Sequence, residues 1–366
     1  MPDTPLRIAH SESSCGWGGQ EIRILNESQG MLERGHDVRL VCPREAPIYS
    51  AARDRGIPVH ALDIRRTRFE GLKQVRRWLN ENPVDVVNTH SSTDSWLFAV
   101  AARTVRRSIQ ILRTRHISAP IPRNPLSHWL YARGARMVVT TGRRLRDSLV
   151  EHHRIPSDHV MSVPTGIDTN RFQPGDRLSR RRELGLPADH TIIAIVATIR
   201  SWKGHEYLID ALHRLNRDDV TLVIVGDGPV RDRVEDQIAR LQLRDYVRMV
   251  GQQDDVVPWL QAADIFALPS YANEGVPQGI LQAMSCELPV ISTTVGSIDE
   301  AVIDNQTGIL VETRHAAAIE QALRRLADDP ALRAQFGAAG RGRVIELFDI
   351  HHMLDRMEAI FQRIAA

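Results

Sequence analysis

Residues 274–311, EGVPQGILQAMSCELPVISTTVGSIDEAVIDNQTGILV, are the segment that most clearly indicates the fold class of this chain. They follow an apolar run, residues 263–270, that is typical of a buried strand. A helix, a second apolar strand and a glycine turn come next. In a parallel sheet this order brings Glu274 and the N-terminus of the next helix to the carboxyl end of a strand, where open α/β sheets bind ligands. The unpaired N–H groups and the dipole of such a helix favour a phosphate.

The composition is that of a globular protein, with 42% hydrophobic residues among 366. This length suits two domains of ordinary size. No run of about 18 apolar residues occurs, so we expect no membrane span. The N-terminus has no basic segment followed by an apolar one, and the three cysteines are scattered. Both features favour a cytoplasmic protein with reduced thiols.

Positive charge is concentrated in the first half of the chain. Residues 1–175 contain 26 Arg and Lys against 17 Asp and Glu, and residues 101–150 alone hold 11 Arg and one acid. Such a stretch is typical of contact with nucleic acid or with an anionic membrane, although a solvated face without a partner is also compatible. Only Trp129 and Tyr131 lie among these arginines, too few for base stacking, so we expect no nucleic-acid partner.

Strand-like apolar runs alternate with helical stretches along the whole chain. The predicted strands of the first half cover residues 6–10, 37–43, 84–89, 109–114, 136–141 and 160–164. Those of the second half cover residues 191–198, 221–228, 247–251, 263–270, 289–294 and 308–312. The alternation predicts two Rossmann-like α/β domains with parallel sheets, residues 1–172 and 173–345, on either side of a central cleft.

The chain ends in a predicted amphipathic helix, residues 349–366. Its apolar positions fall on one face and are Met353, Leu354, Met357, Ile360, Phe361 and Ile364.

Two features of the first half are candidates for ligand binding. The loop GWGGQE, residues 16–21, joins the first strand to the first helix, and Gly18 and Gly19 let backbone N–H groups approach a phosphate or sugar. It is not a GxGxxG fingerprint, and a flexible turn is the alternative interpretation. His116 follows the strand at 109–114, where a neutral imidazole can donate to a sugar hydroxyl, although a capped or surface histidine is the alternative interpretation. His90 also ends a strand and is a candidate for an acceptor pocket.

A short loop after the first strand of the second half carries Arg200 and Lys203, in the sequence IRSWKGH. Two cations there can hold a diphosphate leaving group as its negative charge grows. The chain has only two lysines, Lys73 and Lys203, and only Lys203 lies in a motif. A purely structural role for Lys203 is the alternative.

Glu274 is the principal catalytic candidate. A carboxylate at that place can accept two sugar hydroxyls and stabilise positive charge at an anomeric carbon, although it can also serve only the helix dipole. The sequence contains no DxD pair, no metal-ligand spacing and neither a Walker nor a GxSxG motif. We therefore expect no metal and no cofactor.

Together these motifs resemble those of the retaining glycosyltransferases of family 4, the group 1 glycosyltransferases. The resemblance covers residues 8–344, is strongest over residues 160–311 and implies a GT-B fold whose last helix, residues 346–366, returns to the N-terminal domain. The family's first glutamate falls on Glu274, but the second, eight positions later, is Gln282 here. The amide oxygen of Gln282 can accept one ribose hydroxyl but lacks the charge-assisted grip of a carboxylate.

The same resemblance implies roles for the other candidates. Lys203 corresponds to the lysine that holds the diphosphate, and Arg200 would replace the family's arginine, whose usual position is Thr198 here. His116 falls where the family has a histidine that contacts the donor sugar. Further donor contacts fall on the glycine loop, on the start of the helix after Glu274 and on a strand end near the base: Gly18, Gly19, Gly275, Val276, Pro277, Gln278 and Val250.

The implied activity is transfer of a sugar from a UDP- or GDP-linked donor to a hydroxyl acceptor with retention. A lipid-linked or saccharide acceptor fits, as do bacterial lipopolysaccharide or surface-polysaccharide assembly and peripheral contact with the inner face of the cytoplasmic membrane. A non-hydrolysing nucleotide-sugar epimerase would turn over the donor without an acceptor. A non-catalytic sugar- or nucleotide-binding protein normally has a signal peptide, and an NAD-dependent oxidoreductase needs the full glycine fingerprint.

Overall fold

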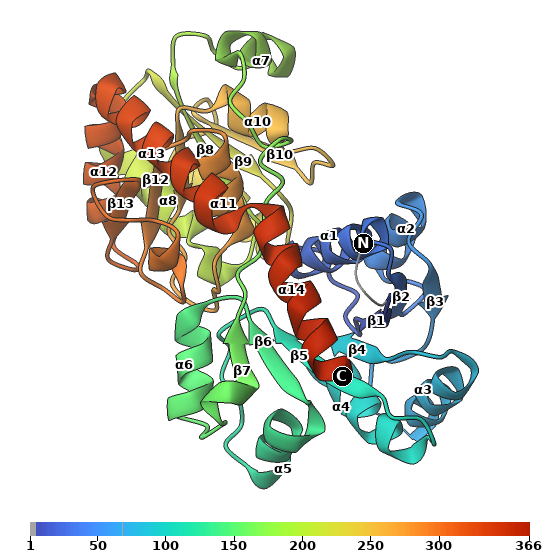
Figure 1. Ribbon diagram of the computed structural model, residues 1–366. Coiled ribbons are helices and arrows are strands. Elements are labelled where there is room, and N and C mark those ends of the chain that lie inside the picture. The colour runs from blue at the N-terminus through green and yellow to red at the C-terminus, as the bar shows by residue number, and fades with distance from the viewer. Residues whose placement is uncertain (1–4, 68) are drawn as a thin grey trace. The chain divides into compact units, whose positions relative to one another are not determined.

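A computed structural model describes residues 5–67 and 69–366 of the chain (Figure 1). The chain divides into two compact units: unit 1 comprises Met1–Gly166 and His351–Ala366, and unit 2 comprises Ile167–Ile350. Each unit contains one sheet, and every pair of neighbouring strands in the described part of the chain is parallel. The predicted α/β class with two parallel sheets is therefore confirmed.

Unit 1 has a seven-stranded sheet in the order β3-β2-β1-β4-β5-β6-β7. The strands are β1 (Arg7–Ser11), β2 (Asp37–Cys42), β3 (Val59–Ala61), β4 (Val86–Thr89), β5 (Gln110–Arg115), β6 (Met137–Thr140) and β7 (Val160–Ser162). Six of them overlap the predicted runs to within one or two residues. Strand β3 was not predicted, because three residues at the edge of a sheet carry too short an apolar pattern to detect.

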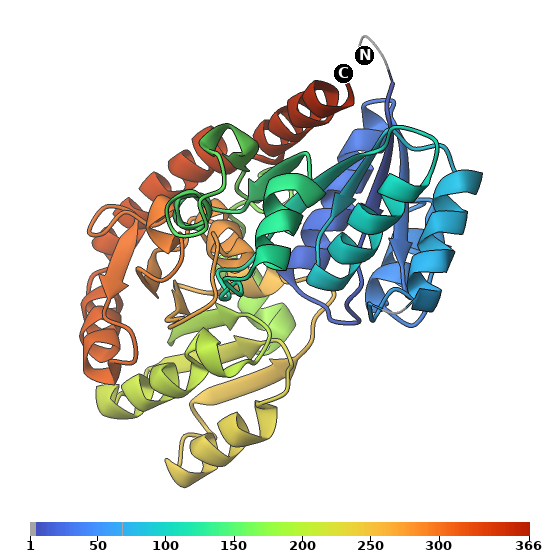
Figure 2. The same cartoon turned by 90° about the horizontal axis from the view of Figure 1, so that it is seen from below.

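Helices cover both faces of this sheet (Figures 1 and 2). The helices of the unit are α1 (Gly19–Glu33), α2 (Pro47–Asp54), α3 (Phe69–Glu81), α4 (Ser92–Ala101), α5 (Pro125–Trp129), α6 (Arg143–Glu151) and α14 (Ile350–Ala365). Short turns of other helix types are η1 (Ala102–Thr104), η2 (Leu130–Gly134) and η3 (Ser157–His159). Helices α1 and α2 share one apolar cluster with β2, while α3 and α4 share another with the strand residues Ala9 and Val87.

Helix α14 packs against α1 within unit 1. All six residues of its predicted apolar face are buried. A Cβ atom at Gly30 of α1 would overlap the side chain of Leu354, so the glycine permits close approach of the two helices. At the edge of this contact Arg34 pairs with Glu358, with Nη1 2.6 Å from Oε2. The amphipathic pattern of the sequence thus corresponds to a buried stripe with charged residues beside it.

Unit 2 has a six-stranded sheet in the order β10-β9-β8-β11-β12-β13. Its strands are β8 (Thr191–Val196), β9 (Val220–Val225), β10 (Val247–Gly251), β11 (Ile265–Leu268), β12 (Val290–Thr293) and β13 (Gly308–Val311). Its helices are α7 (Arg177–Leu184), α8 (His205–Leu215), α9 (Arg231–Arg240), α10 (Val257–Ala262), α11 (Gln278–Ser285), α12 (Ala316–Asp328) and α13 (Pro330–Phe348), with short turns η4 (Ser201–Lys203) and η5 (Ile298–Glu300). All six residues of β9 are buried, which explains its continuous apolar run.

Each sheet has a point at which the chain reverses the direction in which strands are added. In unit 1 this switch point lies between β1 and β4, and in unit 2 it lies between β8 and β11. Loops that leave the carboxyl ends of two such strands run to opposite sides and leave a crevice, which is the usual ligand site of open α/β sheets.

Candidate functional site

The switch point of unit 2 brings together Lys203 and Glu274, the two strongest candidates in the sequence. Lys203 ends η4, which follows β8, and Glu274 lies in the loop after β11. Lys203 Nζ donates to Glu274 Oε1 at 2.7 Å. Only 6% of the Glu274 side chain and 19% of the Lys203 side chain are exposed. The pair is therefore largely removed from water, where an ammonium and a carboxylate interact strongly.

Backbone contacts fix the two loops against each other. The N–H of Tyr271 donates to the carbonyl of Trp202 at 2.8 Å. Gly204 has a φ of +80°, and a Cβ atom there would overlap the carbonyl oxygen of Pro269. Only glycine adopts that conformation without strain and leaves room for the carbonyl, so Gly204 determines how closely the lysine loop approaches the end of β11.

Helix α11 starts four residues after Glu274, and the predicted donor contacts lie at its start. Glu274, Gly275, Val276 and Pro277 are buried, and Pro277 is the N-cap residue of the helix. The first-turn N–H groups of a helix have no partner within it, and together with the helix dipole they attract an anion. The carbonyl of Gly275 accepts a hydrogen bond from Ser297 N–H at 3.1 Å, which anchors this loop to the next one.

Gln282 lies one turn beyond Gln278 on α11 and is 9% exposed. The structure thus places it on the helix that begins at the candidate phosphate site. Its amide has both an acceptor oxygen and a donor nitrogen, whereas a glutamate at the same place would offer acceptors only.

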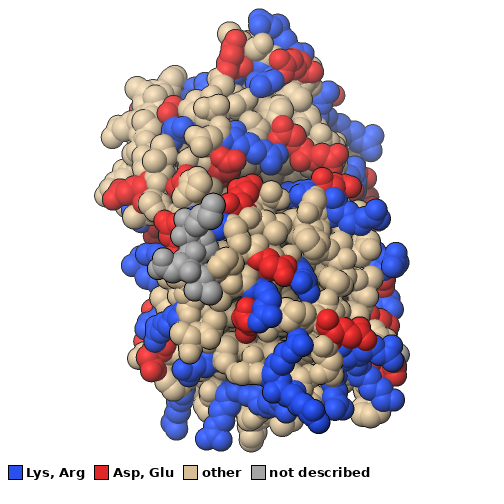
Figure 3. Space-filling view, turned by 45° about the vertical axis from the view of Figure 1, so that its right-hand side comes forward, with Lys and Arg blue, Asp and Glu red and all other residues tan. Residues whose placement is uncertain are grey.

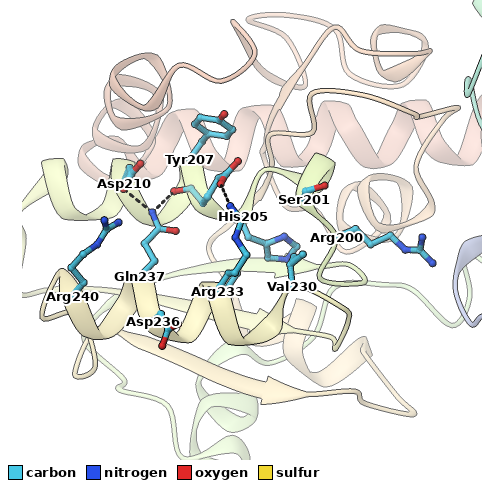
Figure 4. A pocket seen from close by; sticks show the side chains of 12 residues that line it. Arg200, Ser201, His205, Tyr207, Asp210, Val230, Arg233, Asp236, Gln237 and Arg240 are labelled. Carbon is cyan, nitrogen blue, oxygen red and sulfur yellow. Dashed lines mark hydrogen bonds and ion pairs between the residues drawn. The ribbon is translucent and has the colours of Figure 1, made fainter.

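Arg200 is exposed, and its guanidinium lies 5.2 Å from the centre of the Trp202 ring. Figure 4 shows its side chain pointing away from His205. Thr198, at the family's usual arginine position, is half-buried, and its carbonyl accepts a hydrogen bond from the Arg200 N–H at 2.8 Å. The structure thus shows Arg200 stacked on Trp202, and its role at a diphosphate stays a prediction.

Val250 lies near the end of β10, two strands from β8 at the same edge of the sheet. Its carbonyl accepts a hydrogen bond from Gln253 Nε2 at 2.8 Å. A base contact through this carbonyl would share the oxygen with Gln253, and that contact also stays a prediction.

A hollow of about 450 Å³ lies between α8 and α9 (Figure 4). Its wall includes Arg200, Ser201 and His205. Burial, with a smaller contribution from the Lys203 charge, lowers the pKa of His205 to about 3, so this imidazole is neutral. Most of the residues that line the hollow belong to α8 and α9, and we assign no ligand to it.

In unit 1 the candidates gather at the carboxyl ends of β1, β4 and β5. Gly18 is the N-cap residue of α1, and Gly19 is the first residue of that helix. His116 follows β5, and its Nε2 lies 2.9 Å from His90 Nδ1. His90 Nε2 in turn lies 3.0 Å from His10 Nδ1. Burial comes first among the causes that hold the pKa values of His90 and His116 well below 6.5, so these rings are neutral.

Two carboxylates at the same strand ends, Glu12 and Asp94, were not predicted from the sequence. Glu12 Oε1 accepts hydrogen bonds from Ser91 Oγ at 2.5 Å and from Ser14 N–H at 2.7 Å. Asp94 accepts from Ser11 Oγ at 2.8 Å, and burial together with the neighbouring Glu12 charge raises the pKa of Asp94 to about 7. The only signal was a run of polar residues, HSES, directly after the apolar start of β1.

The arginine-rich stretch divides into two parts in the structure. Arg113 and Arg115 are not exposed, and the guanidinium of Arg113 lies 4.7 Å from the centre of the Tyr131 ring. The other part is exposed (Figure 3 shows Lys and Arg side chains gathered on the lower part of one face). The exposed arginines are Arg103, Arg106, Arg107, Arg123, Arg133, Arg136, Arg143 and Arg144.

The exposed arginines form two groups, one at the amino ends and one at the carboxyl ends of strands in the unit 1 sheet. Arg107, Arg133 and Arg136 line a hollow at the amino ends of β5 and β6. Arg143 and Arg144 begin α6, which follows the carboxyl end of β6. Residues 103–146 were predicted as one basic stretch, whereas in the structure their exposed arginines lie at opposite ends of the strands.

Within residues 5–67 and 69–366, no helix is both long and apolar enough to cross a membrane. The same part of the chain contains no group of three His, Cys, Asp or Glu placed to hold a metal ion.

Sequence comparison matches both halves of the chain to known families. Residues 17–171 match Glycosyltransferase Family 4, and residues 176–343 match Glycosyl transferases group 1. The D-inositol 3-phosphate glycosyltransferase of Pseudarthrobacter chlorophenolicus is 25% identical over 93% of this chain and 91% of that protein. The phosphatidyl-myo-inositol mannosyltransferase of Mycobacterium leprae is 24% identical over 95% of this chain and 94% of that protein.

Solved structures show the same fold. A glycosyltransferase from Rickettsia africae matches with a TM-score of 0.88 at 22% identity, over 98% of each chain. Anabaena Alr3699/HepE in complex with UDP-glucose matches with a TM-score of 0.87 at 19% identity, over 98% of this chain and 100% of that one. The predicted GT-B fold class is thereby confirmed.

Proposed function

We propose that this chain, which belongs to the group 1 glycosyltransferases, transfers a sugar from a nucleoside diphosphate donor to a hydroxyl acceptor with retention at the anomeric carbon. The observation that carries the proposal is the buried pair of Lys203 and Glu274 at the switch point of unit 2, beside the start of α11. This place has one cation and one row of helix N–H groups for a diphosphate, and one carboxylate for a sugar.

In the proposed reaction the donor diphosphate replaces Glu274 as the ion-pair partner of Lys203. The ammonium and the N-terminus of α11 then stabilise the negative charge that develops on the leaving phosphate. Glu274, released from the lysine, accepts hydroxyls of the donor sugar and stabilises positive charge at its anomeric carbon. In the resting state the ion pair thus holds both side chains next to each other at the site, so that both are already in place when the donor binds.

Retention follows if the acceptor attacks from the face that the phosphate leaves. The acceptor oxygen forms a bond to the anomeric carbon, the bond from that carbon to the phosphate oxygen breaks, and the acceptor proton passes to the leaving phosphate oxygen. This route needs neither a second carboxylate nor a metal. We propose that the reaction is metal-independent, because the ammonium of Lys203 supplies the positive charge that a metal ion would otherwise supply at the diphosphate.

The donor is proposed to carry uracil or guanine. Gln282 would hold the ribose with a single hydrogen bond where the family's glutamate would use its charge. We therefore expect weaker nucleotide binding than a glutamate would give.

The acceptor is proposed to be a saccharide or a lipid-linked molecule in bacterial lipopolysaccharide or surface-polysaccharide assembly. Supporting observations are the exposed arginines of unit 1 and two relatives whose names specify inositol phosphate or phosphatidylinositol acceptors. Arginines near an anionic membrane contribute about 1 kcal/mol each to binding. They would hold the enzyme at the inner face of the cytoplasmic membrane.

Vesicles that contain anionic lipid test the membrane part of the proposal. The charge-neutral variants R106Q/R107Q and R143Q/R144Q separate the two groups of exposed arginines. Loss of vesicle binding in one variant identifies the docking group, and unchanged binding in both would refute docking through these arginines.

Thermal shift with UDP, GDP, ADP and their sugar conjugates tests the donor site, on the wild type and on Lys203→Ala. We expect stabilisation by one base family, which the variant loses. Absence of a shift with every nucleotide would contradict the transferase and favour a binding protein for another ligand. Turnover of a nucleotide sugar without any acceptor, to a sugar epimer, would favour the epimerase.

A further inference from the structure

Three histidines of unit 1 form a continuous chain of ring-to-ring hydrogen bonds. His116 Nε2 lies 2.9 Å from His90 Nδ1, and His90 Nε2 lies 3.0 Å from His10 Nδ1. The ring planes of His10 and His90 differ by 19°, and those of His90 and His116 differ by 33°, which suits hydrogen bonds that run from edge to edge. Each contact needs one N–H and one bare nitrogen, so the tautomer of one ring fixes that of the next.

With all three rings neutral, the hydrogens of the three histidines can be arranged in two ways. Either every ring carries its hydrogen on Nε2, or every ring carries it on Nδ1. In the first arrangement Nδ1 of His116 is a hydrogen-bond acceptor at the end of the chain, and in the second it is a donor. At the other end His10 Nε2 is buried, so its surroundings can select one of the two arrangements.

Glu27 lies at that inner end. Its Oε1 is 3.9 Å from His10 Nε2, and neither side chain is exposed. Asn88 Nδ2 donates to the same Oε1 at 3.1 Å, and Arg23 Nε lies 3.5 Å from Oε2. Burial raises the pKa of Glu27, but the charge of Arg23 beside Oε2 and the hydrogen bond from Asn88 to Oε1 oppose this rise and favour the carboxylate as an acceptor.

The carboxylate orients the hydrogen of His10 through electrostatics. In the described part of the chain His10 Nε2 has no hydrogen-bond partner, and 3.9 Å is longer than a hydrogen bond. An N–H at this atom points its positive end at Oε1, whereas a bare nitrogen would point its lone pair at the same negative oxygen. In a buried environment this difference is weakly screened, so the Nε2–H form of His10 is favoured.

We propose that Glu27, His10 and His90 are positioning residues that hold His116 in its Nε2–H form, so that His116 Nδ1 accepts a hydrogen bond from a ligand hydroxyl. The identity of that ligand rests on the proposed function, in which it is a sugar hydroxyl of the donor or the acceptor. An acceptor nitrogen attracts hydroxyl groups and repels phosphate oxygens. His116 would therefore select the sugar portion of the ligand, which is the reverse of the donor role expected from the sequence.

The surroundings keep this network rigid. Arg23 Nη1 donates to the carbonyl of Val163 at 2.8 Å, and Asn88 Oδ1 accepts from Thr114 Oγ1 at 2.8 Å. The ring of Phe361 on α14 meets His10 edge-on, with ring centres 6.2 Å apart. The inner end of the chain is thus enclosed by α1, β4, β5 and α14, which favours a single tautomer over an exchanging mixture.

NMR of the ligand-free full-length chain with ¹⁵N-labelled histidine tests the proposal, because protonated and bare ring nitrogens have very different ¹⁵N shifts. We expect His10, His90 and His116 in the Nε2–H form, with couplings across the two hydrogen bonds. A His116 hydrogen on Nδ1 would overturn the proposal. The measurement needs neither donor nor turnover, so its failure and a failure of the proposed function are distinguishable.

Two variants separate positioning from packing. His10→Phe keeps an aromatic ring beside Phe361 but removes the partner of His90 Nε2, and we expect His116 to populate both tautomers. His60→Phe is the matched control and should leave the His116 signals unchanged, because His60 packs on Trp78 and is not one of the three hydrogen-bonded histidines. If His10→Phe does not fold, the isosteric Glu27→Gln is measured with the same criterion. A His116 that stays entirely Nε2–H in the folded variant would overturn the role of the chain.

Discussion

The ion pair of Lys203 and Glu274 gives a prediction with a definite magnitude. Lys203→Met removes the ammonium and keeps the length of the side chain, so it leaves a carboxylate that is 6% exposed without its partner. Breaking a fully buried pair typically costs 3–5 kcal/mol of folding free energy. Because 19% of the lysine side chain is exposed, we expect a smaller loss, about 2 kcal/mol.

Glu274→Gln in the Lys203→Met background should recover most of that loss, because the unpaired buried charge disappears. A loss of about 2 kcal/mol corresponds to a fall in Tm of ~4–8 °C for a unit of this size. Urea denaturation and calorimetry of the two single variants and the double variant measure the coupling. Lys73→Met is the matched control, since Lys73 is the only other lysine, is exposed and should be neutral.

Affinity for a nucleoside diphosphate separates this pair's structural role from its function. We expect the double variant to regain stability but not binding, because a charged hydrogen bond to phosphate contributes about 1.5–3 kcal/mol, or ~10–100-fold in Kd. Additive losses in the double variant would refute the ion-pair reasoning. Full diphosphate affinity in Lys203→Met would refute the role of Lys203 as a phosphate ligand.

Four further outcomes follow from the structure. The pKa of His10 is about 3 in the folded chain, whereas its ordinary value is 6.5, so the unfolded state binds more protons between these two pH values. Acidification to pH 5.5 should therefore lower the free energy of unfolding of unit 1 by about 1.4 kcal/mol from His10 alone. Urea titrations at several pH values measure this loss. Gly204→Ala should destabilise unit 2 by about 1–3 kcal/mol, because Gly204 has a positive φ and the added Cβ atom would overlap the Pro269 carbonyl. Gly342→Ala is the control, since there is open space around Gly342, and it should not be destabilising. Thermal denaturation compares the two variants. Gln282→Glu should tighten nucleotide binding several-fold in calorimetry through a charge-assisted bond to the ribose, and unchanged affinity would place the ribose elsewhere. Chelation with EDTA should leave the transfer rate unchanged, and a loss that Mg²⁺ restores would contradict metal independence.

The fold was largely predictable because its strands are buried on both faces. Continuous apolar runs such as β8 and β9 need no knowledge of partners to be recognised. The strand β3 was missed because it has three residues at a sheet edge, where pairing with β2 rather than local composition defines it. Burial of α14 against α1 depends on Gly30, whose importance shows only when the two helices are placed together.

The placement of a candidate was predictable where the residue follows a recognisable strand, and unpredictable where several strands contribute. Lys203 and Glu274 each follow such a strand, and the structure brings their side chains together. Glu27, which lies within α1, could not be connected with His10, since only the parallel pairing of β1 with β4 brings His10, His90 and Asn88 together. The stacking of Arg200 on Trp202 is likewise a matter of side-chain direction, which spacing does not determine.

Slow hydrolysis of the donor, with water in place of the acceptor, tests the central claim most directly. The full-length chain is incubated with each common UDP- and GDP-linked sugar, and NMR follows the nucleoside diphosphate and the anomeric form of the sugar as it is released. We expect release from one nucleotide family, with the sugar appearing first in the anomeric configuration of the donor, and loss of release in Glu274→Gln. Release of the opposite anomer, or of no nucleoside diphosphate from any donor, would contradict it.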